Sequence, residues 1–142
     1  MKRTTVRLIC LICLLVLGLF ASATISFAAA AKPVRVDVLY MNHGPLKPTL
    51  QKMADLFARH KDGVTVSWHD FESAEGEKFM AAKGIKSHVP LTIWINGADT
   101  VQVEGAKVSF TGFPSGSGPA MFQGKWNLDL LAKALNQATG RK

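Results

Sequence analysis

The sequence predicts a layered α/β domain that starts after residue 30. Segments in which apolar and polar residues alternate, as along a half-buried strand, are followed by segments in which apolar residues recur every three or four positions, as along an amphipathic helix. Strand and helix follow one another twice before residue 85, which is typical of domains in which helices cover a central sheet. Residues 31–142 are enough for one such domain with its own core.

The first 30 residues are predicted to be an export signal. Lys2, Arg3 and Arg7 precede an apolar run over residues 8–20, and small residues follow it up to residue 31. This order is typical of a cleaved secretory signal, whereas an uncleaved membrane anchor is the alternative. We therefore expect a periplasmic or secreted domain of residues 31–142, which touches the membrane only through the signal if that segment is kept.

Both cysteines of the chain, Cys10 and Cys13, fall inside the predicted signal. The exported domain would therefore contain no thiol, so that it could form no disulfide and no thiolate-ligated metal site. Its remaining charge is mildly basic, with lysines and arginines interspersed among acidic residues. A nucleic-acid site requires clustered basic residues, so we expect no nucleic-acid partner.

Residues 34–57 are predicted to form a strand, a tight turn and a helix. Apolar residues alternate with others up to Tyr40, the turn Asn42-His43-Gly44-Pro45 follows, and apolar residues then recur at helical spacing. The first turn of a helix presents unpaired N–H groups and the positive end of the helix dipole. The turn before this helix is therefore the expected place for any chemistry.

The next strand and helix are predicted over residues 64–71 and 74–83. The strand is rich in β-branched and aromatic residues, and the helix has Ser73 as its N-cap and Gly84 as its stop. An apolar strand over residues 91–95 ends at Asn96-Gly97, which is a strong hairpin signal. Residues 100–104 and 108–110 are expected to supply the return strand or strands, with a bend at Gly105.

Residues 111–125 are predicted to be a loop because they are rich in glycine, serine and proline. Apolar residues within and after this loop either pin it to the domain or line a docking surface, and the sequence leaves both alternatives open. These residues are Phe113, Met121, Phe122 and Trp126. A last amphipathic helix begins after Asn127, its N-cap, and ends at Gly140.

The order βαβαββα, with a Gly-Pro turn before the first helix and Val89-Pro90 before the third strand, resembles the thioredoxin superfamily. Members carry Cys-Gly-Pro-Cys and then Lys where this chain has His43-Gly44-Pro45-Leu46-Lys47. The resemblance implies a three-layer α/β/α sandwich in which Pro90 is cis and faces the turn. Dithiol chemistry needs two thiols, so we predict a redox-inactive protein and lean against an enzyme.

The resemblance also implies a peptide-binding face. In the family, the residue before the cis proline offers its backbone groups to an extended peptide, which adds as a short strand. Val89 would do so here. We therefore expect an accessory module that binds an exported protein or peptide partner, with the loop at residues 112–125 extending the face. Its expected contact residues are Asn42, His43, Gly44, Pro45, Val89 and Pro90.

Two other functions remain open from the sequence. His43 and His88 could hold copper or zinc, with Met41, Asn42 or a water completing the site; otherwise no cofactor is expected. Alternatively, His43 could be the general base of an enzyme that works without cysteine, although no carboxylate stands at a fixed spacing from it. His60 is expected to cap a helix end, and His69 to be a half-buried structural residue.

Overall fold

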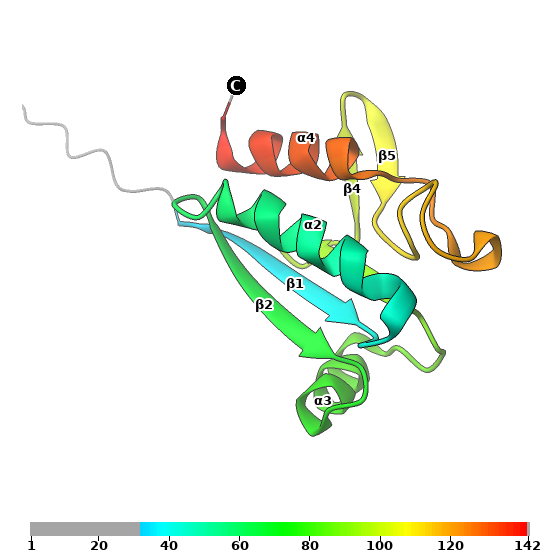
Figure 1. Cartoon of the computed structure of the whole chain (residues 1–142). Helices are drawn as coiled ribbons and strands as arrows, with labels where there is room; N and C mark the ends of the chain where they lie inside the picture. Colours follow the sequence, from blue (N-terminus) through cyan, green and yellow to red (C-terminus); the bar gives the residue numbers. More distant parts are fainter. Residues whose placement is uncertain (1–31, 142) are drawn as a thin grey trace, which may run out of the picture. The chain divides into compact units, whose positions relative to one another are not determined.

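A computed structural model describes residues 32–141, which form a mixed α/β domain (Figure 1). The predicted export signal lies outside the described residues. The helices and strands, with two short 3-10 turns, follow in this order: β1 (Val34–Tyr40), η1 (Gly44–Leu46), α2 (Lys47–Ala58), β2 (Val64–Asp70), α3 (Ala74–Lys83), β3 (Leu91–Ile95), β4 (Thr100–Val103), β5 (Ala106–Ser109), η2 (Ala120–Phe122) and α4 (Leu128–Thr139). Within residues 32–141 no helix is both long and apolar enough to cross a bilayer.

The main sheet has three strands in the order β2-β1-β3. β1 pairs in parallel with β2, so that Val38 lies beside Trp68, and antiparallel with β3, so that Val38 lies beside Ile93 on its other side. Parallel neighbours require a crossover connection, and α2 supplies it between β1 and β2. The strands and helices predicted up to residue 95 are confirmed to within one or two residues.

The return from β3 differs from the expectation. The Asn96-Gly97 turn forms, with φ of 50° and 87°, but residues 100–103 and 106–109 pair with each other as a separate hairpin. The segment that lies against β3 is residues 110–112. Ile93 donates its N–H to the Phe110 carbonyl (3.0 Å), and Gly112 donates to the Leu91 carbonyl (2.8 Å). The outer edge of β3 is therefore covered.

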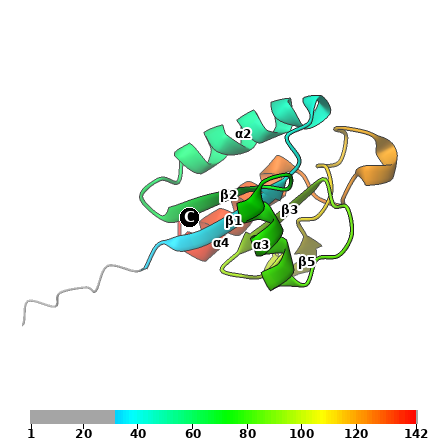
Figure 2. The same ribbon diagram turned by 90° about the horizontal axis from the view of Figure 1, so that it is seen from below.

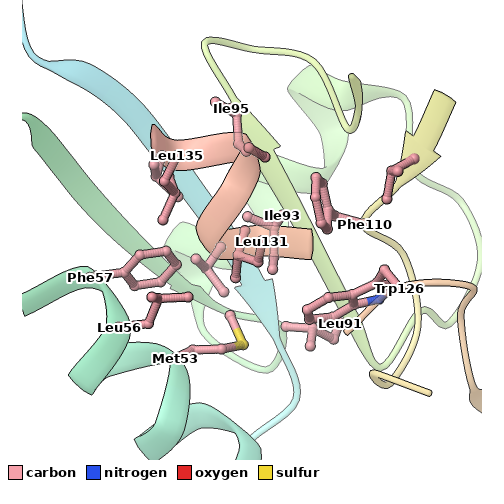
Figure 3. Close-up of a cluster of buried hydrophobic side chains, with 14 of the residues drawn as sticks. Met53, Leu56, Phe57, Leu91, Ile93, Ile95, Phe110, Trp126, Leu131 and Leu135 are labelled. Atoms are coloured by element: carbon pink, nitrogen blue, oxygen red, sulfur yellow. The ribbon is translucent and has the colours of Figure 1, made fainter. Parts of the chain in front are cut away.

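The main core lies on one face of the sheet, between the strands and the helices α2 and α4 (Figure 3). Val36, Val38 and Ile93 point into it from the strands, and Met53 and Leu131 from the two helices, all of them fully buried. The 3.6-residue periodicity of each helix places its apolar side chains on this side. Figures 1 and 2 show α3 on the opposite face.

The face under α3 is partly polar. Asp37 of β1 is buried there, with its carboxylate 2.8 Å from Nε of Arg35 and 3.2 Å from Nε2 of His69. The imidazole of His69 stacks on the Phe79 ring of α3 at 3.8 Å between centroids. His69 is therefore the half-buried structural residue that the sequence predicts.

The expectation of a cis peptide bond before Pro90 is wrong. Every peptide bond among residues 32–141 is trans. The trans form of an X-Pro bond is favoured by about 0.5–1 kcal/mol unless the surroundings demand the other. Here the trans bond is compatible with the sheet, since Met41 donates its N–H to the Pro90 carbonyl at 3.0 Å just before β3 pairs with β1.

Candidate functional site

An apolar cavity of about 270 Å³, which we call the β1-end cavity, lies where β1 ends and α2 begins. It joins three segments that are far apart in the sequence: the turn after β1, the residues before β3, and the loop before α4. Its lining consists of Met41, His43, Pro45, Leu46, His88, Pro90, Phe113, Pro119 and Phe122. The only polar side chains among these nine are the two imidazoles.

The turn after β1 holds His43 at the cavity wall. The His43 backbone is extended (φ −101°, ψ 149°), and its carbonyl accepts the Leu46 N–H at 3.0 Å, which starts a short 3-10 turn before α2. Pro45 fits in this first turn because its missing N–H would have no partner there. Leu46 is buried beneath, whereas the imidazole of His43 stays 52 % exposed.

A carboxylate meets His43 that the sequence did not reveal. Nε2 of His43 lies 3.1 Å from Oε1 of Glu72, which follows β2. Because a carboxylate only accepts, Nε2 carries the proton of this bond, and in the neutral imidazole Nδ1 is then an acceptor. The parallel pairing of β1 with β2, whose ends meet at one edge of the sheet, is the signal that could have found Glu72.

The His43–Glu72 pair is exposed, with 52 % and 63 % of the two side chains accessible. Exposed ion pairs contribute little to stability, so the pair orients the ring rather than holding the fold. A carboxylate that orients an imidazole is one part of a general-base arrangement. No serine, threonine or cysteine side chain lines the cavity to act as a nucleophile beside it.

The segment before β3 contributes His88, Val89 and Pro90. The exposed His88 ring packs edge-to-face on Phe71, with centroids 4.8 Å apart. The Val89 N–H and carbonyl form no hydrogen bond with any of residues 32–141. The backbone next to the cavity is therefore available to pair with another chain.

The loop at residues 111–125 is pinned to the domain, and two of its apolar side chains nevertheless remain exposed. Trp126 is 1 % exposed and donates its indole N–H to the Gly112 carbonyl at 3.1 Å, and Phe113 is also buried. Backbone bonds between Phe113 and both Phe122 (2.8 Å) and Gly124 (2.7 Å) tie the loop to itself. Met121 and Phe122 stay 83 % and 46 % exposed, and Phe122 reaches the cavity.

The six expected contact residues do not all line one surface. His43, Pro45 and Pro90 line the β1-end cavity, whereas Asn42 faces the other side of the turn and lines a shallow groove between α2 and β2. Gly44 and Val89 are next to cavity residues in the chain but do not line it. The role of all six residues in binding stays a prediction.

The structure shows which of the candidate metal ligands lie close to one another. Within residues 32–141, no three histidine, cysteine or acidic side chains are placed to hold one ion. His43 and His88 share a cavity, and the Met41 thioether is the only other soft donor in its lining. His60 is engaged elsewhere: its Nδ1 lies 3.0 Å from the Leu56 carbonyl at the end of α2, as expected for a helix cap, and its Nε2 lies 2.8 Å from Oδ1 of Asn136 in α4.

Tyr40, at the end of β1, has a pKa that departs clearly from its ordinary value. Burial raises the pKa of its hydroxyl above 10.0, and the nearby carboxylate of Asp70 raises it further. Both effects disfavour the phenolate. Tyr40 is therefore a neutral hydrogen-bonding group and not a base at neutral pH.

Comparison of the chain with models of protein families, with curated proteins and with solved structures gives no match.

Proposed function

We propose that the exported chain is a redox-inactive, thioredoxin-like protein that binds an extended segment of a peptide or protein partner at the β1-end cavity. The observation that carries the proposal is an apolar cavity beside the Val89 backbone, whose N–H and carbonyl have no hydrogen-bond partner among residues 32–141. A peptide can insert one side chain into the cavity while its main chain pairs with Val89.

The strand order supports the thioredoxin-like part of the proposal. A parallel β1–β2 pair joined through α2, an antiparallel β3, and helices on both faces fit the three-layer arrangement that the resemblance implies. His43, Pro45, Leu46 and Pro90 line the same cavity, as that resemblance requires. The trans bond before Pro90 and the separate β4–β5 hairpin depart from the expected pattern.

The size of the cavity favours a single side chain as the inserted group. Pockets for drug-sized ligands span about 300–1,000 Å³, and this one has about 270 Å³. The lining is apolar except for two imidazoles at its wall, so a leucine, methionine or phenylalanine side chain suits it best. Burying such a side chain contributes about 1.5–3 kcal/mol, and main-chain hydrogen bonds supply the rest of the affinity.

Peptide selection tests the proposal. A displayed library of extended peptides is selected on tag-free residues 31–142, and the affinity of the peptides recovered is measured by calorimetry. Phe122→Asp should weaken binding at least about tenfold, because a carboxylate would then be buried against the inserted apolar group. Met121→Asp is the matched control, since Met121 is a neighbouring exposed residue that does not line the cavity.

Two results would contradict this proposal: no peptide recovered above background, or equal weakening by both substitutions. Methylating the main-chain nitrogens of the selected peptide tests the strand-like mode, because this change removes donors and leaves the side chains intact.

An insulin-reduction assay tests the redox part separately. Turnover by the exported chain would show that the absence of thiols does not abolish the activity.

Copper binding is a second candidate function, favoured by the presence of Met41, His43 and His88 in one cavity lining. A thioether and two imidazoles suit copper, and zinc would prefer further nitrogen or oxygen ligands. Calorimetric titration of tag-free protein with each ion tests it. Tight binding that is lost in His43→Ala and His88→Ala but kept in His69→Gln would support a metal site, and no heat of binding would exclude one.

A further inference from the structure

β2 is an edge strand, and its free backbone groups can be identified. The Phe71 N–H bonds to the Tyr40 carbonyl of β1 at 2.8 Å. Because backbone groups alternate in direction along a strand, the groups of residues 65, 67 and 69 also face β1, and those of residues 64, 66, 68 and 70 face outward. Figure 1 shows no other strand beside β2.

Two of the outward groups already have partners within the chain. The Val64 N–H donates to the His60 carbonyl (3.1 Å), and the Asp70 carbonyl accepts from both the N–H and the hydroxyl of Ser73 (3.0 and 2.8 Å). Six outward groups remain without a hydrogen bond among residues 32–141. They are the carbonyls of Val64, Val66 and Trp68 and the N–H groups of Val66, Trp68 and Asp70.

These six groups are self-complementary. Suppose that a second copy of β2 lies antiparallel with Ser67 opposite Ser67. Val66 of each copy then lies opposite Trp68 of the other copy, and the two residues exchange two hydrogen bonds at each of the two symmetry-related positions. The Asp70 N–H of each copy then meets the free Val64 carbonyl of the other. This one register uses every free group and leaves none over. We infer that the β2 edge binds the β2 edge of a second copy of this chain and so forms a continuous sheet across a two-fold axis.

The side chains fit the same register. Trp68 is 39 % exposed and packs edge-on against Tyr40 and Phe57, with both ring centroids at 5.8 Å. It would lie opposite Val66 of the second copy, and aromatic residues pair well with β-branched residues across strands. Open grooves flank Trp68 on both sides where α2 meets β2, so this face has apolar surface to bury.

The charges are also complementary. Asp70 would lie opposite Val64 of the second copy, and Lys61 lines a groove together with Val64. Each carboxylate therefore comes near a lysine of the other copy, twice by symmetry. On the opposite face Thr65 meets His69, and no like charges face each other across the pair.

The β2 edge also lacks the usual protection. Natural edge strands are commonly blunted by lysine, proline or a bulge, because free backbone groups recruit other strands. Residues 64–70, Val-Thr-Val-Ser-Trp-His-Asp, contain neither lysine nor proline and pair with β1 residue for residue. An unprotected edge that matches itself is expected to be occupied.

Sedimentation equilibrium of residues 31–142 over a wide concentration range tests this inference, with a dimer as the expected species. Val66→Pro removes an outward N–H and leaves the ladder to β1 intact, as prolines on edge strands do. It should weaken dimerisation about 30-fold or more, because two donors are lost and two carbonyls lose their partners. Circular dichroism checks that the variant folds.

Lys61→Glu is a second variant that does not alter the strand. It should weaken the dimer a few-fold and more so at low salt, because it places a carboxylate near Asp70 of the other copy. Lys107→Glu, the same change on β5, is the matched control and should have no effect. A monomer at every concentration, or a dimer that Lys61→Glu and Lys107→Glu affect equally, would overturn the inference. No residue of the β1-end cavity lining takes part, so this test is independent of the proposed function.

Discussion

The face of the main sheet under α2 and α4 is held by close-packed apolar side chains, whereas the face under α3 is organised around a buried carboxylate. On the first face Leu131 and Leu135 of α4 are fully buried against the strands. On the second, the Asp37 carboxylate accepts from Arg35 and His69, and the His69 imidazole stacks on the Phe79 ring of α3. The same strand, β1, contributes to both faces through alternate residues.

Stability and specificity come from different faces of this small domain. Apolar burial is non-directional and tolerates rearrangement, so the α2–α4 face supplies most of the folding free energy. A buried carboxylate contributes less net stability, because its desolvation offsets much of what its partners return. The buried carboxylate does require particular partners at particular positions. This requirement fixes how α3 packs on that face.

The greatest loss of stability should come from truncating a side chain on the apolar face. Leu131→Ala should lower the free energy of unfolding by about 3 kcal/mol, because it removes buried methyl groups and leaves a cavity. Urea denaturation followed by circular dichroism measures the loss. Gln137→Ala, on the exposed side of the same helix, should change it by less than about 0.5 kcal/mol. Similar losses in both variants would mean that α4 is not packed as described.

Asp37→Ala should lower the free energy of unfolding by about 2 kcal/mol, because Arg35 and His69 lose the acceptor that they share. Asp37→Asn should lose less, since the amide oxygen can still accept from one of them. Urea denaturation of both variants provides the measurement. A gain in stability in Asp37→Ala would show that the buried carboxylate costs more than its hydrogen bonds return, and would point to a role other than folding.

A smaller loss of stability is expected when the charge of Lys83 is removed at the outer end of the aromatic stack. The Lys83 ammonium lies 5.1 Å from the Trp94 ring centroid and 5.6 Å from that of Phe79. Lys83→Gln keeps the length of the side chain and removes its charge, so it should cost about 0.5 kcal/mol. Lys78→Gln, on the same helix, serves as the control. Thermal unfolding of the two variants side by side decides whether the cation on the rings contributes at all.

The smallest effect concerns the titration of Tyr40, whose side chain lies beside Trp68 on the α2 side of the sheet. It is the only tyrosine of the chain, so ultraviolet absorbance of the phenolate reports on it alone. Its pKa is raised above 10.0, first by burial and then by Asp70. The pKa of Tyr40 is therefore higher in the folded state than in the unfolded chain. The contribution of the protonated Tyr40 hydroxyl to the free energy of unfolding is complete below about pH 10 and is lost as the pH rises through the folded-state pKa. Asp70→Asn should lower the pKa, and an unchanged value would exclude Asp70 as a cause.

Much of the secondary structure could be predicted because its signals are local. The Ser73 hydroxyl accepts from the Gly76 N–H (2.9 Å), and the Asn127 side chain accepts from the Leu130 N–H (2.9 Å), as expected of N-caps. Gly84 ends α3 with φ of 67°, a conformation that glycine adopts without strain. Each of these signals involves residues only a few positions apart.

The candidate site could be predicted only in part. The turn at His43 and the residues before β3 were expected to meet, and both border the β1-end cavity. Glu72 was missed because the strand-helix-strand order predicts that β2 lies beside β1 but not which side chain after β2 turns towards His43. The turns at Asn96-Gly97 and Glu104-Gly105 have similar backbone conformations, so the chain alone could not show whether residues 100–103 pair with β3 or with residues 106–109.

By itself, the sequence determines which segments become strands and helices and that no cysteine follows residue 13, because periodicity, caps and composition are properties of neighbouring residues. The contact of His43 with Glu72 and the burial of Asp37 between Arg35 and His69 arise only in the tertiary structure. The same holds for the meeting of Phe122 and Met41, 81 positions apart in the chain, in one cavity lining. These contacts depend on the order of the strands and the return of the last loop, and both are set by burial summed over the whole domain.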